Sequence, residues 1–426
     1  MALDVDIRGV KYAFFLGNTP ALSLAELFAV SARLGVDLKI VRWSKEVALG
    51  ETASNVSMDQ LFHALAGLVK VAEITKAVPG ALTAEQVRSM LPTTGRKLFF
   101  GLSAYVLEPS ARAIDCRKLG LGVKRLLSEE ERSARFVTSR EDTLSSVVIN
   151  TNKLLSERGA EIVVLSLPNG AYLGRTLAVQ PYEEYAQRDM ERPARDAKIG
   201  MLPPKIARMM VNLARMSPGE TLLDPFCGSG TVLQEAALLG IDRLLGSDRD
   251  KKAVERTRIN LEWLGNFTSQ MKTASFSMQL IACSIEELPA HMPQGGIHAI
   301  VTEPYLGPPR IKPLSPEEVP QMRMELASLY RRAFASFTRV LAPGGRVVMI
   351  WPVWRVAGKS VSRTAVAFLD LERAAQEAGL AVIDPFLEHL RPVPGAEHGY
   401  LKERHSLLYQ REDQQVMREI RIFKKT

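Results

Sequence analysis

The chain has 426 residues, of which 46% are hydrophobic and 24% are charged. This composition is that of a globular protein with a substantial core, and the length favours two or three domains. The formal net charge of +8 is compatible with a polyanionic partner such as nucleic acid but does not require one.

Cysteine usage and the start of the chain argue against several classes of protein. Cys116, Cys227 and Cys283 are far apart and form no CxxC pair, so neither a zinc site nor a disulfide framework is expected. The N-terminus carries charges where a signal peptide needs an apolar core, and no apolar run approaches the length of a membrane span. We therefore expect a cytoplasmic protein with no metal and no membrane partner.

The first half of the chain mixes strands and helices in the order of one or two small α+β domains. Strands are expected at 11–17, 97–107 and 160–167, and helices at 22–35, 57–74 and 143–159. Ser23 and Glu26 have the spacing of a capping box at the start of the first helix. Residues 180–205 are polar, charged and interrupted by prolines, which indicates either a connector between domains or a solvated loop.

From residue 201 onward, strands and helices alternate at the spacing of βαβ units. Strands are expected at 221–226, 243–248, 278–284, 297–303, 346–352 and 380–386, and helices at 205–216, 231–240, 251–265, 316–341 and 365–379. Two further strands, 405–411 and 416–425, have the pattern of a hairpin. The order predicts an α/β fold with a mostly parallel, doubly wound, Rossmann-like sheet and an antiparallel edge.

The stretch "LLDPFCGSG" predicts a nucleotide pocket at the end of the first strand of this sheet. Asp224 ends the strand, and Gly228 and Gly230 let the backbone turn tightly before a helix whose first N–H groups point at the same place. No GK[ST] follows, which excludes a P-loop, and the glycine spacing departs from the dinucleotide fingerprint. A strand-end carboxylate suits the amino group or the sulfonium of S-adenosylmethionine.

Two further strand ends continue this pattern. Asp248 ends the next strand, where an acid accepts hydrogen bonds from ribose hydroxyls. Ser284 follows the third strand and is placed to meet the adenine. Each acid alone would be read more simply as a helix cap, but the three strand ends in order favour an S-adenosylmethionine site.

The motifs "DPFCGSG", "GSDRD" and "TEPY" together resemble those of class I N-methyltransferases that act on exocyclic amines of bases. Residues 12–30, 65–74 and 136–155 are similar to the N-terminal and THUMP regions of the tRNA guanosine-N2 methyltransferases, the archaeal and eukaryotic enzymes that modify position 10 of tRNA. Residues 188–214 resemble that family's linker and first methyltransferase motif. The resemblance covers roughly residues 12–350 and, more weakly, the last hairpin.

The resemblance implies a division of the chain and a set of site residues. The implied parts are an N-terminal α+β domain at 1–95, a THUMP-like RNA-binding domain at 96–180, a linker at 181–200 and a Rossmann-like S-adenosylmethionine-dependent methyltransferase domain at 201–426. The candidate cofactor-binding residues are Met201, Pro204, Asp224, Pro225, Phe226, Gly228, Gly230, Asp248, Arg249 and Ser284. The candidate catalytic residues are Thr302, Glu303, Pro304 and Tyr305.

The candidate catalytic stretch departs from the family pattern. In that family the fourth strand ends in an acid or Asn, two prolines and an aromatic residue, whereas here Thr302 takes the place of the acid and Glu303 that of the first proline. Guanine N2 is a poor nucleophile, so the site must orient it and offer an oxygen acceptor to its N–H. We expect Tyr305 to stack on the flipped base, and Glu303, or the carbonyl of Glu303 or Pro304, to be the acceptor. Alternatively, Glu303 caps a turn and Tyr305 packs in the core.

Basic side chains in the first half favour an RNA partner as a set, although any one of them could lie on a plain solvated helix face. They are Lys70, Arg117, Lys118, Lys124, Arg125, Arg135, Arg140 and Lys153. The predicted function is methylation of a guanosine N2 in tRNA, with position 10 as the expected target and other structured RNA as a possible partner. Alternatives are a guanine of ribosomal RNA, an adenine of DNA, and an RNA-binding protein with a vestigial methyltransferase domain. A nicotinamide oxidoreductase is disfavoured by the glycine spacing.

Overall fold

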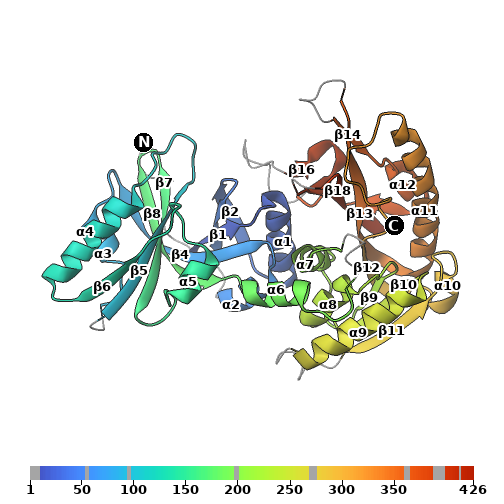
Figure 1. The fold of residues 1–426 in the computed structure, drawn as a ribbon, viewed down its shortest axis with the longest axis horizontal. Coiled ribbons are helices and arrows are strands. Elements are labelled where there is room, and N and C mark those ends of the chain that lie inside the picture. The colour runs from blue at the N-terminus through green and yellow to red at the C-terminus, as the bar shows by residue number, and fades with distance from the viewer. Residues whose placement is uncertain are drawn as a thin grey trace. The chain divides into compact units, whose positions relative to one another are not determined.

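The structure is a computed structural model and describes residues 10–52, 57–93, 97–195, 201–267, 276–358, 365–386, 399–411 and 414–426. The described residues form two compact units (Figure 1). Unit 1 contains residues up to 23 and residues 34–184, and unit 2 contains residues 24–33, 185–386 and 399–426.

Unit 1 is built on a sheet of eight described strands in the order β2-β3-β1-β4-β8-β7-β5-β6. The strands are β1 Val10–Leu16, β2 Leu38–Trp43, β3 Val47–Thr52, β4 Leu68–Pro79, β5 Lys97–Val106, β6 Ser133–Val137, β7 Gly159–Leu167 and β8 Gly170–Val179. The helices are α2 Met58–Ala64, α3 Ala84–Arg88, α4 Cys116–Glu129 and α5 Ser146–Thr151, with α1 Pro20–Arg33 beginning in this unit. Because β4 pairs with β8, strands on both sides of residue 95 share one sheet. The subdivision at residue 95 stays a prediction.

Two helices expected in unit 1 are shorter than their patterns indicated. The helix expected at 57–74 ends at Ala64, and Leu68 begins β4, which pairs with β1 on one side and with β8 on the other. The helix expected at 143–159 covers only Ser146–Thr151. In the first case strand pairing on both sides outweighs local helical pattern, since every backbone N–H and C=O of a central strand finds a partner.

Of the eight basic residues expected to favour RNA binding, Lys70 is the one for which the described structure contradicts the prediction. Its side chain is buried, and its Nζ lies 2.5 Å from Glu161 Oε1. Thr176 Oγ1 donates to the other carboxylate oxygen at 2.6 Å, and Ser103 Oγ also bonds to Glu161. A lysine in this position neutralises a buried carboxylate inside the sheet and is not available to RNA. The other seven basic residues are exposed.

Unit 2 contains the Rossmann-like sheet that the sequence predicts. Its strands follow the order β11-β10-β9-β12-β13-β18-β17-β16, with β14 paired to β13 and β15 to β18. The bounds are β9 Thr221–Asp224, β10 Arg243–Asp248, β11 Ser277–Ala282, β12 Ile297–Thr302, β13 Leu341–Val356, β14 Ala365–Phe368, β15 Leu380–Val382, β16 Tyr400–Leu401, β17 Ser406–Tyr409 and β18 Val416–Lys425. Strands β9 to β13 pair in parallel, and β18 is antiparallel to β13.

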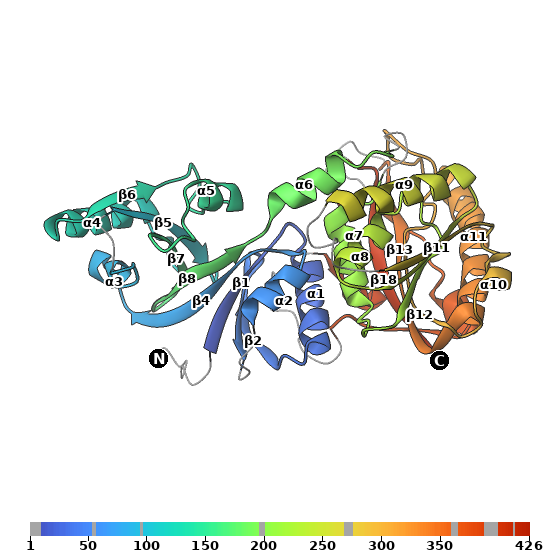
Figure 2. The ribbon, with the colours of Figure 1, turned by 90° about the horizontal axis from the view of Figure 1, so that it is seen from below.

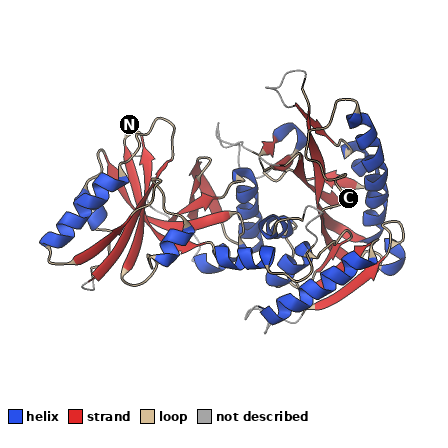
Figure 3. Ribbon diagram, in the orientation of Figure 1, coloured by secondary structure: helices blue, strands red, loops and turns tan. Residues whose placement is uncertain are grey.

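Helices cover both faces of this sheet, as Figure 2 shows, and Figure 3 separates them from the strands by colour. On one face lie α7 Pro204–Leu213, α8 Thr231–Leu238 and α9 Lys251–Phe267, and on the other lie α10 Leu288–His291 and α11 Glu318–Val340. The unit also contains α12 Glu372–Glu377, the short 3-10 helix η1 Lys402–Arg404, and residues 24–33 of α1. The helix expected at 365–379 covers only Glu372–Glu377, and its expected first residues, Ala365–Phe368, instead pair with β13 as β14.

Helix α11 shows how the apolar pattern positions the sheet. Leu326, Tyr330, Phe334 and Phe337 recur at helical spacing and are all buried. Phe334 and Phe423 approach Trp351 of β13, with ring centroids 6.1 and 5.8 Å from the indole. The stripe thus fixes the long helix against strands β13 and β18, which lead to the carboxyl edge of the sheet.

The segment expected as a connector has a packed part. Helix α6, Tyr182–Met190, carries Arg188, whose Nε donates to Glu235 Oε1 of α8 at 2.7 Å with both side chains buried. Arg192 is also buried, and its Nη1 donates to Thr231 Oγ1 at 2.7 Å. Residues 185–195 therefore belong to unit 2, because their arginines find buried acceptors there.

Candidate active site at the carboxyl ends of the strands

Three neighbouring parallel strands bring the predicted polar residues to one edge of the sheet. Asp224 ends β9, Asp248 ends β10 and Thr302 ends β12, and β9 lies between the other two. Since parallel strands present their carboxyl ends at the same edge, these side chains gather there without any need for long loops. This edge is the part of unit 2 where the sequence predicts the cofactor and catalytic residues.

The glycine loop between β9 and α8 is held by the acid of the next strand. Asp248 Oδ2 accepts from the Gly228 N–H at 3.1 Å, and its Oδ1 accepts from the Asp250 N–H at 3.0 Å. A carboxylate can accept about four hydrogen bonds, so acceptor capacity remains for ribose hydroxyls. Asp248 therefore shapes the loop and stays able to bind a ligand.

Gly230 is required by the backbone at the start of α8. It is the N-cap of the helix with a φ of +79°, a left-handed conformation that residues with a side chain rarely adopt. A Cβ here would lie 2.9 Å from Thr257 Cγ2 of helix α9. The glycine thus lets the loop and the first turn of α8 approach α9 closely, which leaves the helix N–H groups facing the strand ends.

Asp224 is hydrogen-bonded to the last residue of β12. Thr302 Oγ1 donates to Asp224 Oδ1 at 2.6 Å, and the Phe226 N–H donates to the same oxygen at 3.2 Å. Both Asp224 and Thr302 are buried. Burial raises the pKa of Asp224 from 3.8 to about 7, although the bond from Thr302 opposes that rise. Thr302 therefore links the end of β12 to the end of β9, and its hydroxyl proton is directed at Asp224.

The raised pKa of Asp224 leads to a prediction about stability. The folded state binds this proton more tightly than the unfolded chain does, so the contribution of Asp224 to the free energy of unfolding should fall as pH rises from about 4 to about 7. The full difference amounts to roughly 4 kcal/mol. Denaturant unfolding of the wild type and of Asp224→Asn across this range should show the wild type losing stability relative to the variant. A difference that is independent of pH would contradict the prediction.

The loop after β12 is fixed by side chains from three other elements. The Tyr330 hydroxyl of α11 lies 3.4 Å from the Tyr305 carbonyl and 3.3 Å from the Ile350 carbonyl, so its one proton is shared between these two acceptors. Trp354 of β13 donates its Nε1–H to the Leu306 carbonyl at 3.4 Å. Arg418 of β18 donates its Nε–H to Glu303 Oε1 at 2.5 Å. The carbonyls of Glu303 and Pro304 accept no hydrogen bond within the described ranges.

The Tyr305 side chain does not pack in the core. Its exposed fraction is 53%, whereas Thr302, three residues earlier, is fully buried. The alternative in which Tyr305 is a core residue is therefore wrong. The backbone of Tyr305 lies in a loop fixed by neighbouring side chains, while its ring is open to solvent at the edge of the site. A ring placed in this way is suited to stack on a planar ligand.

The remaining predicted residues lie around this edge in different ways. Ser284 follows β11, and the N–H of its neighbour Cys283 donates to the Asp248 carbonyl at 3.1 Å, so Ser284 lies beside the second strand end. Arg249 is exposed next to Asp248. Pro225 and Phe226 form the loop after Asp224, and Pro204 begins α7. Met201 accepts from Arg192 Nη2 through its Sδ at 3.3 Å, which ties it to the segment that contacts Thr231.

Sequence reasoning missed two residues that build the cofactor side. Asn260 of α9 donates its Nδ2–H to the carbonyls of Ser229 and Ala194, each at 2.9 Å, and accepts from the Ala194 N–H at 2.9 Å. Arg192 bonds to the first residue of α8. The sequence could have indicated Asn260, because it is a polar residue on the buried face of the predicted helix 251–265. A buried polar side chain of this kind needs a hydrogen-bond partner inside the protein.

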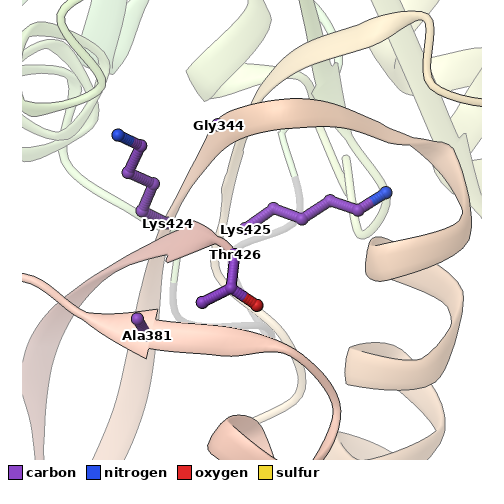
Figure 4. A pocket seen from close by; sticks show the side chains of 5 residues that line it. All are labelled: Gly344, Ala381, Lys424, Lys425 and Thr426. Atoms are coloured by element: carbon purple, nitrogen blue, oxygen red, sulfur yellow. The ribbon is translucent and has the colours of Figure 1, made fainter.

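The described part of the chain contains no cluster of three or more His, Cys, Asp or Glu side chains that could hold a metal ion. A shallow hollow of about 380 Å³ is lined by Gly344, Ala381, Lys424, Lys425 and Thr426 (Figure 4). By strand register it lies toward the amino end of β12, away from Thr302.

None of the helices in the described ranges combines the length and the apolar character that crossing a bilayer requires.

Comparison with known proteins defines the class of unit 2. The family described as "RMKL-like, methyltransferase domain" matches residues 192–302. TrmN from Thermus thermophilus, a solved structure, covers 98% of this chain and 100% of its own with a TM-score of 0.54 at 15% sequence identity. The C-terminal region has the fold of the class I S-adenosylmethionine-dependent methyltransferases, which confirms the predicted fold class there.

Parts of the chain are similar in sequence to three archaeal proteins of the same name. The chain is 32% identical over 163 residues to the tRNA (guanine(10)-N2)-dimethyltransferase of Methanocaldococcus jannaschii, which covers 38% of this chain and 45% of the relative. It is 34% identical over 170 residues to the protein of the same name from Pyrococcus abyssi, covering 40% of this chain and 44% of the relative. A third protein of that name, from Methanothermobacter thermautotrophicus, is 46% identical over 94 residues, 22% of this chain and 27% of the relative. The chain thus matches less than half the length of each of these relatives.

Proposed function

We propose that this protein transfers a methyl group from S-adenosylmethionine to the exocyclic N2 of a guanosine in tRNA, with position 10 as the target. The observation that carries the proposal is the meeting of Asp224, Asp248 and the Thr302–Tyr305 stretch at neighbouring strand ends. The names of the similar proteins support the choice of tRNA and of guanine N2.

The cofactor side of the site fits S-adenosylmethionine. The Gly228 to Gly230 loop and the start of α8 give close backbone approach, and no lysine follows the glycines to hold a phosphate chain. Asp248 has acceptor capacity for ribose hydroxyls, and Asp224 has a carboxyl group whose ionised form a nearby cation would favour. When bound, the cofactor supplies an electrophilic methyl carbon next to a positive sulfur.

The protein's contribution to transfer is orientation and an acceptor for the amine. Tyr305 stacks on the flipped base and holds its plane. The oxygens of Glu303, or the carbonyl of Pro304, accept from the amine N–H, which fixes its lone pair toward the methyl carbon and offsets the positive charge that develops on nitrogen. Thr302, which takes the place of the family's acid, does not serve as the acceptor for the amine, because its side chain is buried and its hydroxyl donates to Asp224.

Unit 1 is proposed to bind RNA, with residues 96–180 as the THUMP-like part. Four of the exposed basic residues, Arg117, Lys118, Lys124 and Arg125, lie along α4. Phosphate contacts of this kind release counterions, so binding of tRNA should weaken steeply with salt. A tRNA substrate also agrees with the cytoplasmic location expected from the sequence.

The proposal is tested by identifying the methylated nucleoside. The full-length protein is incubated with labelled cofactor and, separately, with unmodified tRNA, ribosomal RNA and DNA, and the digested products are separated by mass spectrometry. N2-methylguanosine or N2,N2-dimethylguanosine from tRNA alone is the expected result. A methylated product from ribosomal RNA or DNA would show that this nucleic acid, and not tRNA, is the substrate. Binding of RNA without methyl transfer to any substrate would indicate a vestigial methyltransferase domain.

A further inference from the structure

The Glu303 carboxylate is held by a cation from the last strand of the chain. Arg418 Nε lies 2.5 Å from Glu303 Oε1. The exposed fractions of the two side chains are 5% for Arg418 and 15% for Glu303. Exposed ion pairs contribute little energy, but a pair this far from solvent leaves an uncompensated charge when one partner is removed. The pair is therefore a fixed element of the site.

The sheet register explains why these two residues meet. Thr302 pairs with Met349 of β13, and Arg418 of the antiparallel β18 pairs with Pro352, further along the same strand. Arg418 thus stands at the start of β18, at the edge from which the loop after Thr302 emerges. Its Nη1 also donates to the neutral Gln414 Oε1 at 3.0 Å, so Glu303 is its carboxylate partner within the described residues.

The geometry leaves one oxygen of Glu303 for a ligand. Arg418 bonds to Oε1, and no hydrogen bond to Oε2 exists within the described part of the chain. A carboxylate whose first oxygen is fixed loses less rotamer freedom when its second oxygen accepts a hydrogen bond. Arg418 would orient Glu303 in the same way that a third residue orients the base in many catalytic groups.

We infer that Arg418 is a positioning residue of the methyl-transfer site, which orients Glu303 so that Oε2 accepts a hydrogen bond from the amine of the target base. The inference rests on the proposed function and chooses the carboxylate of Glu303 over the loop carbonyls as the acceptor. It assigns to Arg418 an effect on the rate of transfer. It assigns no effect on the affinity for cofactor or RNA.

The test compares Arg418→Gln, Arg418→Lys, Glu303→Gln and the Glu303→Gln, Arg418→Gln double variant in the full-length protein. The single-turnover rate at saturating RNA, the KM for RNA and the cofactor affinity are measured for each. Arg418→Gln should lower the rate about 10- to 100-fold with the other two quantities unchanged, as expected when a positioned group is displaced by a fraction of an ångström to an ångström. Arg418→Lys keeps the positive charge and should therefore be faster than Arg418→Gln but slower than the wild type. The double variant should be no slower than Glu303→Gln alone, because the two residues act as one unit.

Arg404→Gln is the matched control. It breaks another ion pair to β18, that of Arg404 with Glu419 at 2.7 Å, whose side chains are 20% and 0% exposed. This variant should lose stability and keep the wild-type rate. A wild-type rate in Arg418→Gln, a loss no greater than that of Arg404→Gln, or a change confined to the KM for RNA would each overturn the inference. Wild-type protein that methylates no RNA would overturn the proposed function itself, whereas the other outcomes leave it standing.

Discussion

Replacing Tyr305 with alanine is expected to remove most methyl transfer and to leave the affinity for cofactor nearly intact. The ring is half exposed while its carbonyl is held by Tyr330, so truncation removes the stacking surface without releasing the loop. Stacking of a base on an aromatic side chain contributes about 1–3 kcal/mol, which corresponds to a loss of roughly 5- to 150-fold in the rate at subsaturating RNA. Methyl incorporation into tRNA and calorimetric titration with S-adenosylhomocysteine measure the two quantities.

Tyr305→Phe is the control for this prediction, since it keeps the ring and removes only the hydroxyl. It should retain most of the activity. Wild-type turnover in Tyr305→Ala would rule out the stacking role, and a parallel loss of cofactor affinity would show that the residue supports the cofactor loop instead.

Replacing Asp248 with alanine is expected to weaken cofactor binding by about 100-fold or more. The carboxylate holds the Gly228 N–H and is placed to accept from ribose hydroxyls, and hydrogen bonds to a charged group contribute about 1.5–3 kcal/mol each. Loss of the carboxylate therefore removes direct contacts and also loosens the glycine loop. Titration with S-adenosylhomocysteine measures the effect.

Asp250→Ala is the matched control for Asp248→Ala. It removes an acid two positions along, whose Oδ1 accepts from the Lys252 N–H at the start of α9. The net charge changes equally, so general electrostatics cannot account for a difference between the two variants. Equal cofactor affinity in the two variants would contradict a specific role for Asp248.

Unit 2 was more predictable than unit 1 for a physical reason. In a parallel sheet the chain order of strands and helices is local, and three of the strands here, β9, β10 and β12, end in a polar residue. Asp224, Asp248 and the stretch from Thr302 were found in this way, and the sheet aligns them. In unit 1, strands such as β4 are specified by partners far along the chain, including β8, and their apolar pattern also suited a helix.

Charged residues were the least predictable part of the chain. Lys70 reads as a surface cation until its contact with Glu161, 91 residues away, is known. Arg188 and Arg192 read as parts of a polar connector, yet both are buried against α8. A sequence gives the charge of a side chain, whereas its partner and its burial depend on which distant elements the fold brings beside it.

The sequence by itself determined the Rossmann-like α/β fold of the C-terminal region, the glycine loop and the polar strand ends, because periodicity and turn chemistry depend on neighbouring residues. Only the tertiary structure decided the burial and the partners of the proposed catalytic residues Thr302 and Glu303. Thr302 lies inside and donates to Asp224, 78 residues earlier, and Glu303 is bonded to Arg418, 115 residues later. These contacts depend on the register of β12, β13 and β18, which no local pattern encodes.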